Sequence, residues 1–189
     1  TSGCKDRQAF MTTYVALLYS IILGEGRRLV MADLKEMAGE LGLKNPRTLV
    51  ATGNLLFEKR KTALPVLEAK LEKAFAARFG KHIDIILRDA DTWRSVVAAN
   101  PYPQEAAADP EKVGLRIMRQ PIDAAGFDTL RRYLGPNEDA CMIDGNLWAH
   151  FGDGTQKTRF LSAVTPKRAG IGTWRNWNTV RRLGEMVDV

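Results

Sequence analysis

Apolar positions in the first half of the chain follow strand-like and helical periods in turn. A continuous apolar run over residues 12–23 predicts a buried strand, and shorter apolar runs predict further strands at residues 48–51, 55–58 and 83–87. Apolar residues at helical spacing predict two helices, which end at Gly42 and Gly80. The order strand, helix, strand, strand, helix, strand is the ferredoxin-like arrangement, and an added helix is predicted after it at residues 91–99.

The second half begins with the same kinds of element. A strand is predicted at residues 113–118, then a helix around Phe127 and Leu130, then two strands that flank the hairpin signal Asp144-Gly145-Asn146. Short helical pieces and a final helix marked by Val180 and Leu183 follow. We therefore predict an α+β fold: a ferredoxin-like βαββαβ N-terminal half, and a second, smaller α+β half that begins β-α-β-β and ends in helix.

Loss of periodicity suggests where the chain divides. Prolines and an alanine run interrupt both periods at residues 100–111, which is typical of a linker. The predicted organisation is an extension or tag remnant at 1–11, a ferredoxin-like domain at 12–99, the linker, and a second domain with a basic C-terminal segment at 112–189.

Composition narrows the class of protein. Of 189 residues, 45% are hydrophobic and 26% charged, which is typical of a globular protein. The longest apolar stretch, Tyr14 to Leu23, is shorter than the roughly 20 residues of a membrane span. Two cysteines and two histidines offer few metal ligands and no disulfide framework. We expect a cytoplasmic protein with no membrane association, no metal and no cofactor; the sequence does not indicate its oligomeric state.

The surplus positive charge is confined to one segment. The net charge is +6, and residues 155–183 contain no Asp or Glu but seven basic residues: Lys157, Arg159, Lys167, Arg168, Arg175, Arg181 and Arg182. This segment predicts a C-terminal basic surface that binds an anionic ligand or nucleic acid. Two alternatives are a protein-interaction module for an acidic partner and a solvated surface that aids solubility.

A glycine-containing turn offers a second candidate site. Gly24 and Gly26 follow the first strand and precede a helix, the position of a phosphate-cradling turn, and Arg27 and Arg28 would add charged donors. Leu29 stands where the dinucleotide fingerprint has its third glycine, so the turn can also be a connection that needs positive φ. Together with Lys157 and Arg159, this turn predicts the alternative of an enzyme that handles a phosphate-bearing small molecule.

Two further segments have a functional and a structural interpretation. Thr52-Gly53-Asn54 at a hairpin tip either presents polar groups to a ligand or satisfies the turn. Trp148, Trp174 and Trp177 either stack on bases or anchor the core, and Asn176 and Asn178 are natural helix caps. In the segment Arg175-Asn176-Trp177-Asn178 we expect the tryptophan and asparagines to be structural and Arg175 alone to be exposed to a ligand.

The sequence does not name a catalytic reaction. Cys141 lies among apolar neighbours and is interpreted as an inert core thiol. His82 and His150 have no flanking carboxylate at a meaningful spacing, and no glycine-serine elbow is present. An enzymatic activity is therefore left open, and no residue is assigned a catalytic role.

Several segments taken together resemble a bacterial family of unknown function, DUF1697. They are YVALLYSIILGEG, MADLKEMAGELGLKNPRTLVATGN, RDADTWRSVVAANPYP and TWRNWNTVRRL, and the resemblance covers roughly residues 12–187. Gly53-Asn54 lies at the family's usual hairpin. The chain departs from the family at Tyr19–Gly24 and at Gly154–Arg159, where relatives have an Arg-Gly-Ile-Asn run and a glycine-rich Ser-Lys-Leu element. The resemblance implies a fold and supplies no reaction.

Overall fold

The structure is a computed structural model that describes residues 10–49 and 53–189. Most of the predicted extension at 1–11 lies outside the described residues, as do Thr52 of the hairpin tip and the end of the strand predicted at 48–51. Met11, the last residue of that predicted extension, already belongs to the first strand.

The N-terminal half is ferredoxin-like, as the sequence predicts. Its elements are β1 (Met11–Leu18), α1 (Met31–Glu40), β4 (Lys44–Leu49), β5 (Asn54–Arg60), α2 (Leu64–Phe79) and β6 (Ile85–Asp89). The four strands form one antiparallel sheet in the order β4-β5-β1-β6, with β1 in the interior. Gly42 and Gly80 follow their helices with φ of 74° each, a left-handed conformation that glycine adopts without strain.

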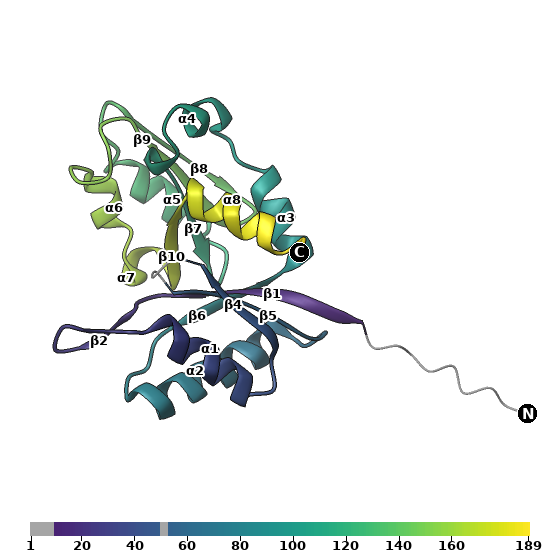
Figure 1. The fold of residues 1–189 in the computed structure, drawn as a ribbon. Coiled ribbons are helices and arrows are strands. Elements are labelled where there is room, and N and C mark those ends of the chain that lie inside the picture. The colour runs from purple at the N-terminus through teal and green to yellow at the C-terminus, as the bar shows by residue number, and fades with distance from the viewer. Residues whose placement is uncertain (1–9, 50–52) are drawn as a thin grey trace, which may run out of the picture.

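The first strand is shorter than the sequence predicts. β1 ends at Leu18, and residues 19–28 turn away to form a separate two-stranded hairpin of β2 (Ile22–Gly24) and β3 (Arg27–Arg28). Figure 1 shows this hairpin projecting sideways from the N-terminal half. Ile22 on it is 41% exposed. The strand prediction failed because the apolar run continues beyond the point where the sheet ends.

The C-terminal half repeats the whole strand order of the N-terminal half. Its elements are β7 (Val113–Met118), α5 (Ala124–Arg131), β8 (Glu138–Ile143), β9 (Asn146–Phe151), α6 (Arg159–Ala163), α7 (Pro166–Ala169), β10 (Gly172–Asn176) and α8 (Trp177–Met186). The sheet order is β10-β7-β9-β8, again antiparallel. The sequence predicts the β-α-β-β opening and the final helix, and it misses the edge strand β10.

The segment between the halves is helical. α3 (Ala90–Ala98) is followed by α4 (Pro103–Ala108) and a 3-10 turn, η2 (Pro110–Lys112). Tyr102 and Ala106, both inside the predicted linker, are buried in the core. Division of the chain into two domains at residues 100–111 stays a prediction.

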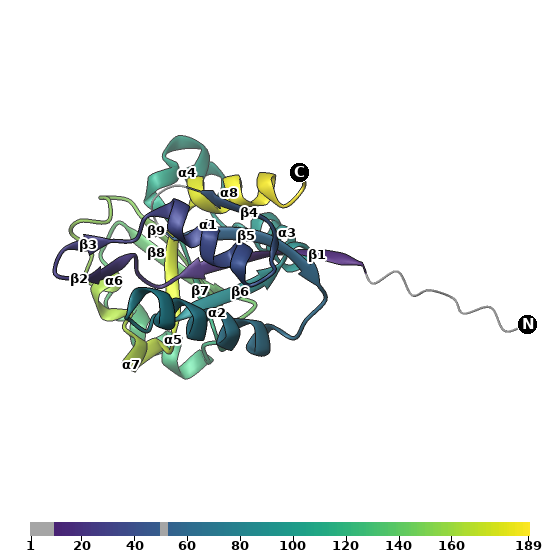
Figure 2. The same cartoon turned by 60° about the horizontal axis from the view of Figure 1, so that its bottom comes forward.

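Three apolar clusters hold the layers together. One joins the facing sides of the two sheets through α3 and α8, with Trp93 and Trp148 among its largest side chains. The second lies between the N-terminal sheet and α1 and α2, and the third between the C-terminal sheet and α5, α6 and α7. Figures 1 and 2 show α1 and α2 on the outer face of the N-terminal sheet and α3 beside α8 between the halves.

Candidate anion-binding site

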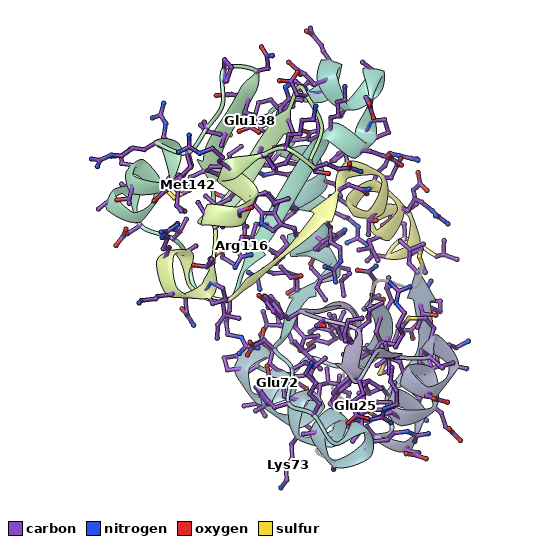
Figure 3. All side chains as sticks on the ribbon, turned by 90° about the vertical axis from the view of Figure 1, so that its left-hand side faces the viewer. Glu25, Glu72, Lys73, Arg116, Glu138 and Met142 are labelled. Atoms are coloured by element: carbon purple, nitrogen blue, oxygen red, sulfur yellow. The ribbon has the colours of Figure 1, made fainter. Side chains whose placement is uncertain are left out.

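The basic C-terminal segment contributes to an open hollow of about 600 Å³. Three stretches line it: Lys112 before β7, the connection from α5 to β8, and the loop from β9 to α6. The residues of this basic hollow are Lys112, Tyr133, Leu134, Gly135, Pro136, Asn137, Glu138, Gly152, Asp153, Gly154, Lys157 and Arg159. Figure 3 labels Glu138 at the end of the C-terminal half that is remote from the N-terminal half.

Close backbone contact fixes two of these stretches against each other. The N–H of Gly152 donates to the carbonyl of Asn137 at 2.8 Å. A Cβ at position 152 would lie 2.5 Å from that carbonyl oxygen, a distance that no side chain tolerates. Glycine at 152 is therefore required where the β8–β9 pairing ends at Glu138 and Phe151.

The charges of the basic hollow are mixed, with an excess of positive charge. Lys157 and Arg159 are exposed, and among the described residues neither forms an ion pair. Lys112 lies 3.8 Å from a carboxylate oxygen of Asp109. The two carboxylates that line the hollow are those of Glu138 and Asp153. Because Lys112 already faces Asp109, the cations available to an anion in this hollow are Lys157 and Arg159.

Short hydrogen bonds orient the two carboxylates. Oε2 of Glu138 accepts from the backbone N–H of Gly135 at 2.8 Å. Oδ2 of Asp153 accepts from Nδ2 of Asn137 at 3.0 Å. Each carboxylate is thereby fixed to another residue that lines the hollow.

The remaining basic residues of the C-terminal segment lie around the hollow or apart from it. On α7, Lys167 and Arg168 are exposed, and the guanidinium of Arg168 lies 5.1 Å from the centroid of the Tyr133 ring. Arg168 therefore contacts a residue that lines the hollow without lining the hollow itself. Arg181 on α8 pairs with Glu185. The structure therefore brings Lys157 and Arg159 together in one site and leaves Lys167 outside its lining.

The Gly24–Arg28 turn does not connect a strand to a helix. It closes the β2–β3 hairpin, where Gly24 and Gly26 have φ of 119° and 77°, and Arg27 and Arg28 are exposed on β3. The expected position at a helix start is wrong, since α1 begins only at Met31. The structural interpretation of these glycines, that the connection needs residues with positive φ, is confirmed. In Figure 3, Glu25 of this turn and Glu138 of the hollow lie in opposite halves of the molecule.

The expectation that Arg175 is exposed is wrong. Its side chain is only 8% exposed and lies between the two halves. Nε donates to Oδ1 of Asn54 at 2.6 Å, and Nη2 donates to the carbonyls of Leu18 at 2.9 Å and Gly53 at 3.3 Å. Nη1 donates within its own strand, to Oγ1 of Thr173 and to the carbonyl of Trp174, both at 2.8 Å.

Three residues predicted for ligand binding thus meet in the interior. Gly53, Asn54 and Arg175 join the end of the N-terminal sheet to β10 of the C-terminal sheet. Burial lowers the pKa of Arg175 to about 10. A Cβ at Gly53 would lie 2.8 Å from Cβ of Leu18, so the backbone at Gly53 lies too close to Leu18 for any side chain at position 53. The geometry is that of an internal clasp, and ligand binding by these residues stays a prediction.

The tryptophans pack against other aromatic rings. Trp148 is buried with its ring 6.1 Å from that of Trp177, and Trp174 contacts Phe151 and Phe160 edge-on at 6.1 and 6.4 Å. These ring contacts match the interpretation of the three tryptophans as core anchors.

The sequence did not predict a polar cluster around Tyr102 and Asp139. Asp139 on β8 lies directly opposite His150 on β9, and its Oδ2 accepts from the hydroxyl of Tyr102 at 2.9 Å. Burial raises the pKa of Cys141 and also that of Tyr102, so both side chains are protonated at neutral pH. A protonated, half-buried thiol fits the interpretation of Cys141 as an unreactive side chain.

The sequence identifies Lys157 and Arg159 by charge but misses the other residues of the hollow. Lys112 ends η2, Glu138 begins β8 and Asp153 lies in the loop after β9. Only the fold brings these separate segments to the hollow that Lys157 also lines. One signal was available: Gly154–Arg159, where the chain departs from the family pattern, is the loop that carries Gly154, Lys157 and Arg159 into the lining.

Two general tests limit the chemistry. Over residues 10–49 and 53–189, no group of three or more His, Cys, Asp or Glu side chains is arranged to hold a metal ion. In the same residues, no helix has the length and apolar character needed to cross a bilayer.

The comparisons with known proteins agree on family and fold. The family described as "Protein of unknown function (DUF1697)" matches residues 11–148. The conserved bacterial protein SP0830 from Streptococcus pneumoniae has a similar structure, with a TM-score of 0.74 at 22% identity over 94% of this chain and 99% of that one. No curated protein matches the chain. Since the family match spans most of the chain and includes the whole N-terminal sheet, the protein belongs to the DUF1697 family.

Proposed function

We propose that the C-terminal half binds a small anionic ligand in the basic hollow. The observation that carries this proposal is the pair Lys157 and Arg159, which are exposed, form no ion pair among the described residues and line a hollow of about 600 Å³ together with Lys112. Unpaired cations at a concave surface attract and orient phosphate or carboxylate groups. The proposal narrows the predicted basic surface to one part of it.

A small ligand is favoured over nucleic acid by the shape and the aromatic content of this region. Binding of single strands uses aromatic faces on which bases stack. Here Trp174 and Trp177 pack against neighbouring rings, and the Tyr133 ring faces the guanidinium of Arg168. A concave site of several hundred Å³ is typical of small-molecule binding.

Isothermal titration with inorganic phosphate and pyrophosphate, at about 50 mM salt, tests the proposal. We expect measurable binding of at least pyrophosphate to the wild-type protein. In the double variant Lys157→Gln/Arg159→Gln the affinity should fall about 10- to 100-fold, because two charge-assisted contacts are lost. The matched control is Lys70→Gln/Lys73→Gln, which removes the same charge from exposed positions on α2.

Three outcomes would contradict the proposal. They are no binding of either anion to the wild-type protein, an equal loss in the α2 control, and an unchanged affinity in the hollow variant. A third variant, Lys167→Gln/Arg168→Gln, tests the wider surface. If it abolishes binding of mixed oligonucleotides that the hollow variant still binds, the nucleic-acid interpretation is the correct one.

A further inference from the structure

The basic hollow is larger and chemically more varied than an inorganic anion needs. Its volume is about 600 Å³. Sites that enclose a small organic molecule are typically about 300–1,000 Å³. The ligand therefore has a body beyond its anionic group.

The lining indicates what that body carries. Glu138 and Asp153 each present a carboxylate to a hollow whose other charged groups are Lys112, Lys157 and Arg159. A carboxylate has about four acceptor positions. In the described part of the chain, each of these two accepts one hydrogen bond, from Gly135 and from Asn137 respectively. Acceptor positions are thus left for donors on a ligand.

The two sets of groups make opposite demands on a ligand. A purely anionic ligand is attracted by Lys157 and Arg159 and repelled by the two carboxylates, whereas a neutral one leaves those two cations without a counter-charge. Hydroxyl groups satisfy carboxylates without adding charge. Lys157 and Arg159, the cations of the lining with no ion pair among the described residues, match the charge of one phosphate monoester, and several hydroxyl groups on the same ligand match the two carboxylates.

We infer that the basic hollow selects a phosphate monoester of a polyhydroxylated carbon chain or ring, with the phosphate at Lys112, Lys157 and Arg159 and the hydroxyl groups at Glu138 and Asp153. This inference rests on the proposed function, since it assigns the same cations to the anionic group. It adds a role for the two carboxylates, which then determine which phosphate esters bind. The site would therefore prefer a hydroxylated phosphate ester over inorganic phosphate.

Three phosphate esters with the same six-carbon chain test the inference on the wild-type protein: sorbitol 6-phosphate, hexyl phosphate and 6-aminohexyl phosphate. Titration calorimetry should show sorbitol 6-phosphate binding at least tenfold more tightly than hexyl phosphate, because its hydroxyl groups donate to Glu138 and Asp153. Equal affinity for the two esters overturns the inference. Tightest binding of the amino ester also overturns it, because the carboxylates would then recognise an ammonium group.

Variants connect this preference to the two carboxylates. Glu138→Gln and Asp153→Asn keep side-chain shape and an oxygen acceptor for Gly135 and Asn137, but remove the negative charge. We expect the preference for sorbitol 6-phosphate to fall at least fivefold in the double variant, while inorganic phosphate binds as well as before or better. An unchanged preference overturns the inference and leaves the proposed function intact. The proposed function is tested separately, by whether the variant Lys157→Gln/Arg159→Gln loses binding of inorganic phosphate.

Discussion

Replacement of Arg175 by alanine should destabilise the protein strongly. Among the described residues the guanidinium donates to five acceptors, and three of them, on Leu18, Gly53 and Asn54, belong to the other half of the molecule. Hydrogen bonds to a charged group are worth about 1.5–3 kcal/mol each, and a buried acceptor that loses its donor costs about 1–3 kcal/mol. These effects are not additive, and we expect a loss of about 3–5 kcal/mol in the free energy of unfolding.

Urea denaturation with linear extrapolation measures this loss. Arg182→Ala is the control, because Arg182 is exposed on the same C-terminal segment, and its loss should stay below about 0.5 kcal/mol. Arg175→Lys keeps the charge but lacks the planar fork, so it should lie between wild type and Arg175→Ala. A loss below about 1 kcal/mol in Arg175→Ala, with an unchanged denaturant slope, would refute the assignment of Arg175 as an internal clasp.

Two further predictions concern a buried carboxyl group and a helix cap. Burial raises the pKa of Glu68 above its ordinary 4.5, so the free energy of unfolding of the wild-type protein should fall as the pH rises through that raised pKa. In Glu68→Gln this fall should be absent. Urea titrations at pH values below and above the transition measure it, and a constant difference in stability between the two proteins would contradict the prediction. Oδ1 of Asn176 accepts from the N–H of Thr179 at 3.1 Å at the start of α8, so Asn176→Ala should cost about 0.5–2 kcal/mol by thermal or urea unfolding, and Asn178→Ala much less.

Local sequence patterns predict most of this fold. Helix stripes, glycine stops and the Asp144-Gly145 hairpin depend on neighbours within a few positions, and the structure confirms all of them. β10 was missed because residues 172–176 contain a single large apolar side chain, Trp174, which is too short a pattern to predict a strand. Its partner β7 lies more than fifty positions earlier, and only pairing with β7 makes this segment a strand.

Local charge is a poorer guide to the site. It located Lys157 and Arg159 correctly in one hollow but also selected Arg175, which is buried. Whether an arginine is exposed depends on which carbonyls the fold brings to it. For Arg175 these carbonyls come from the ends of β1 and β5, over a hundred positions away.

The repeated strand order has a consequence for the protein while it is being synthesised. The N-terminal sheet has all its strands once Asp89 has left the ribosome, but the C-terminal sheet needs β10, which ends at Asn176. At roughly 5–20 residues per second, the roughly 90 intervening residues take about 4–18 s to add. For those seconds, Val15, Leu17 and Ile86 on the inner face of the first sheet await their covering layer. A nascent chain with such a face in contact with water is a substrate for chaperones and a risk for aggregation.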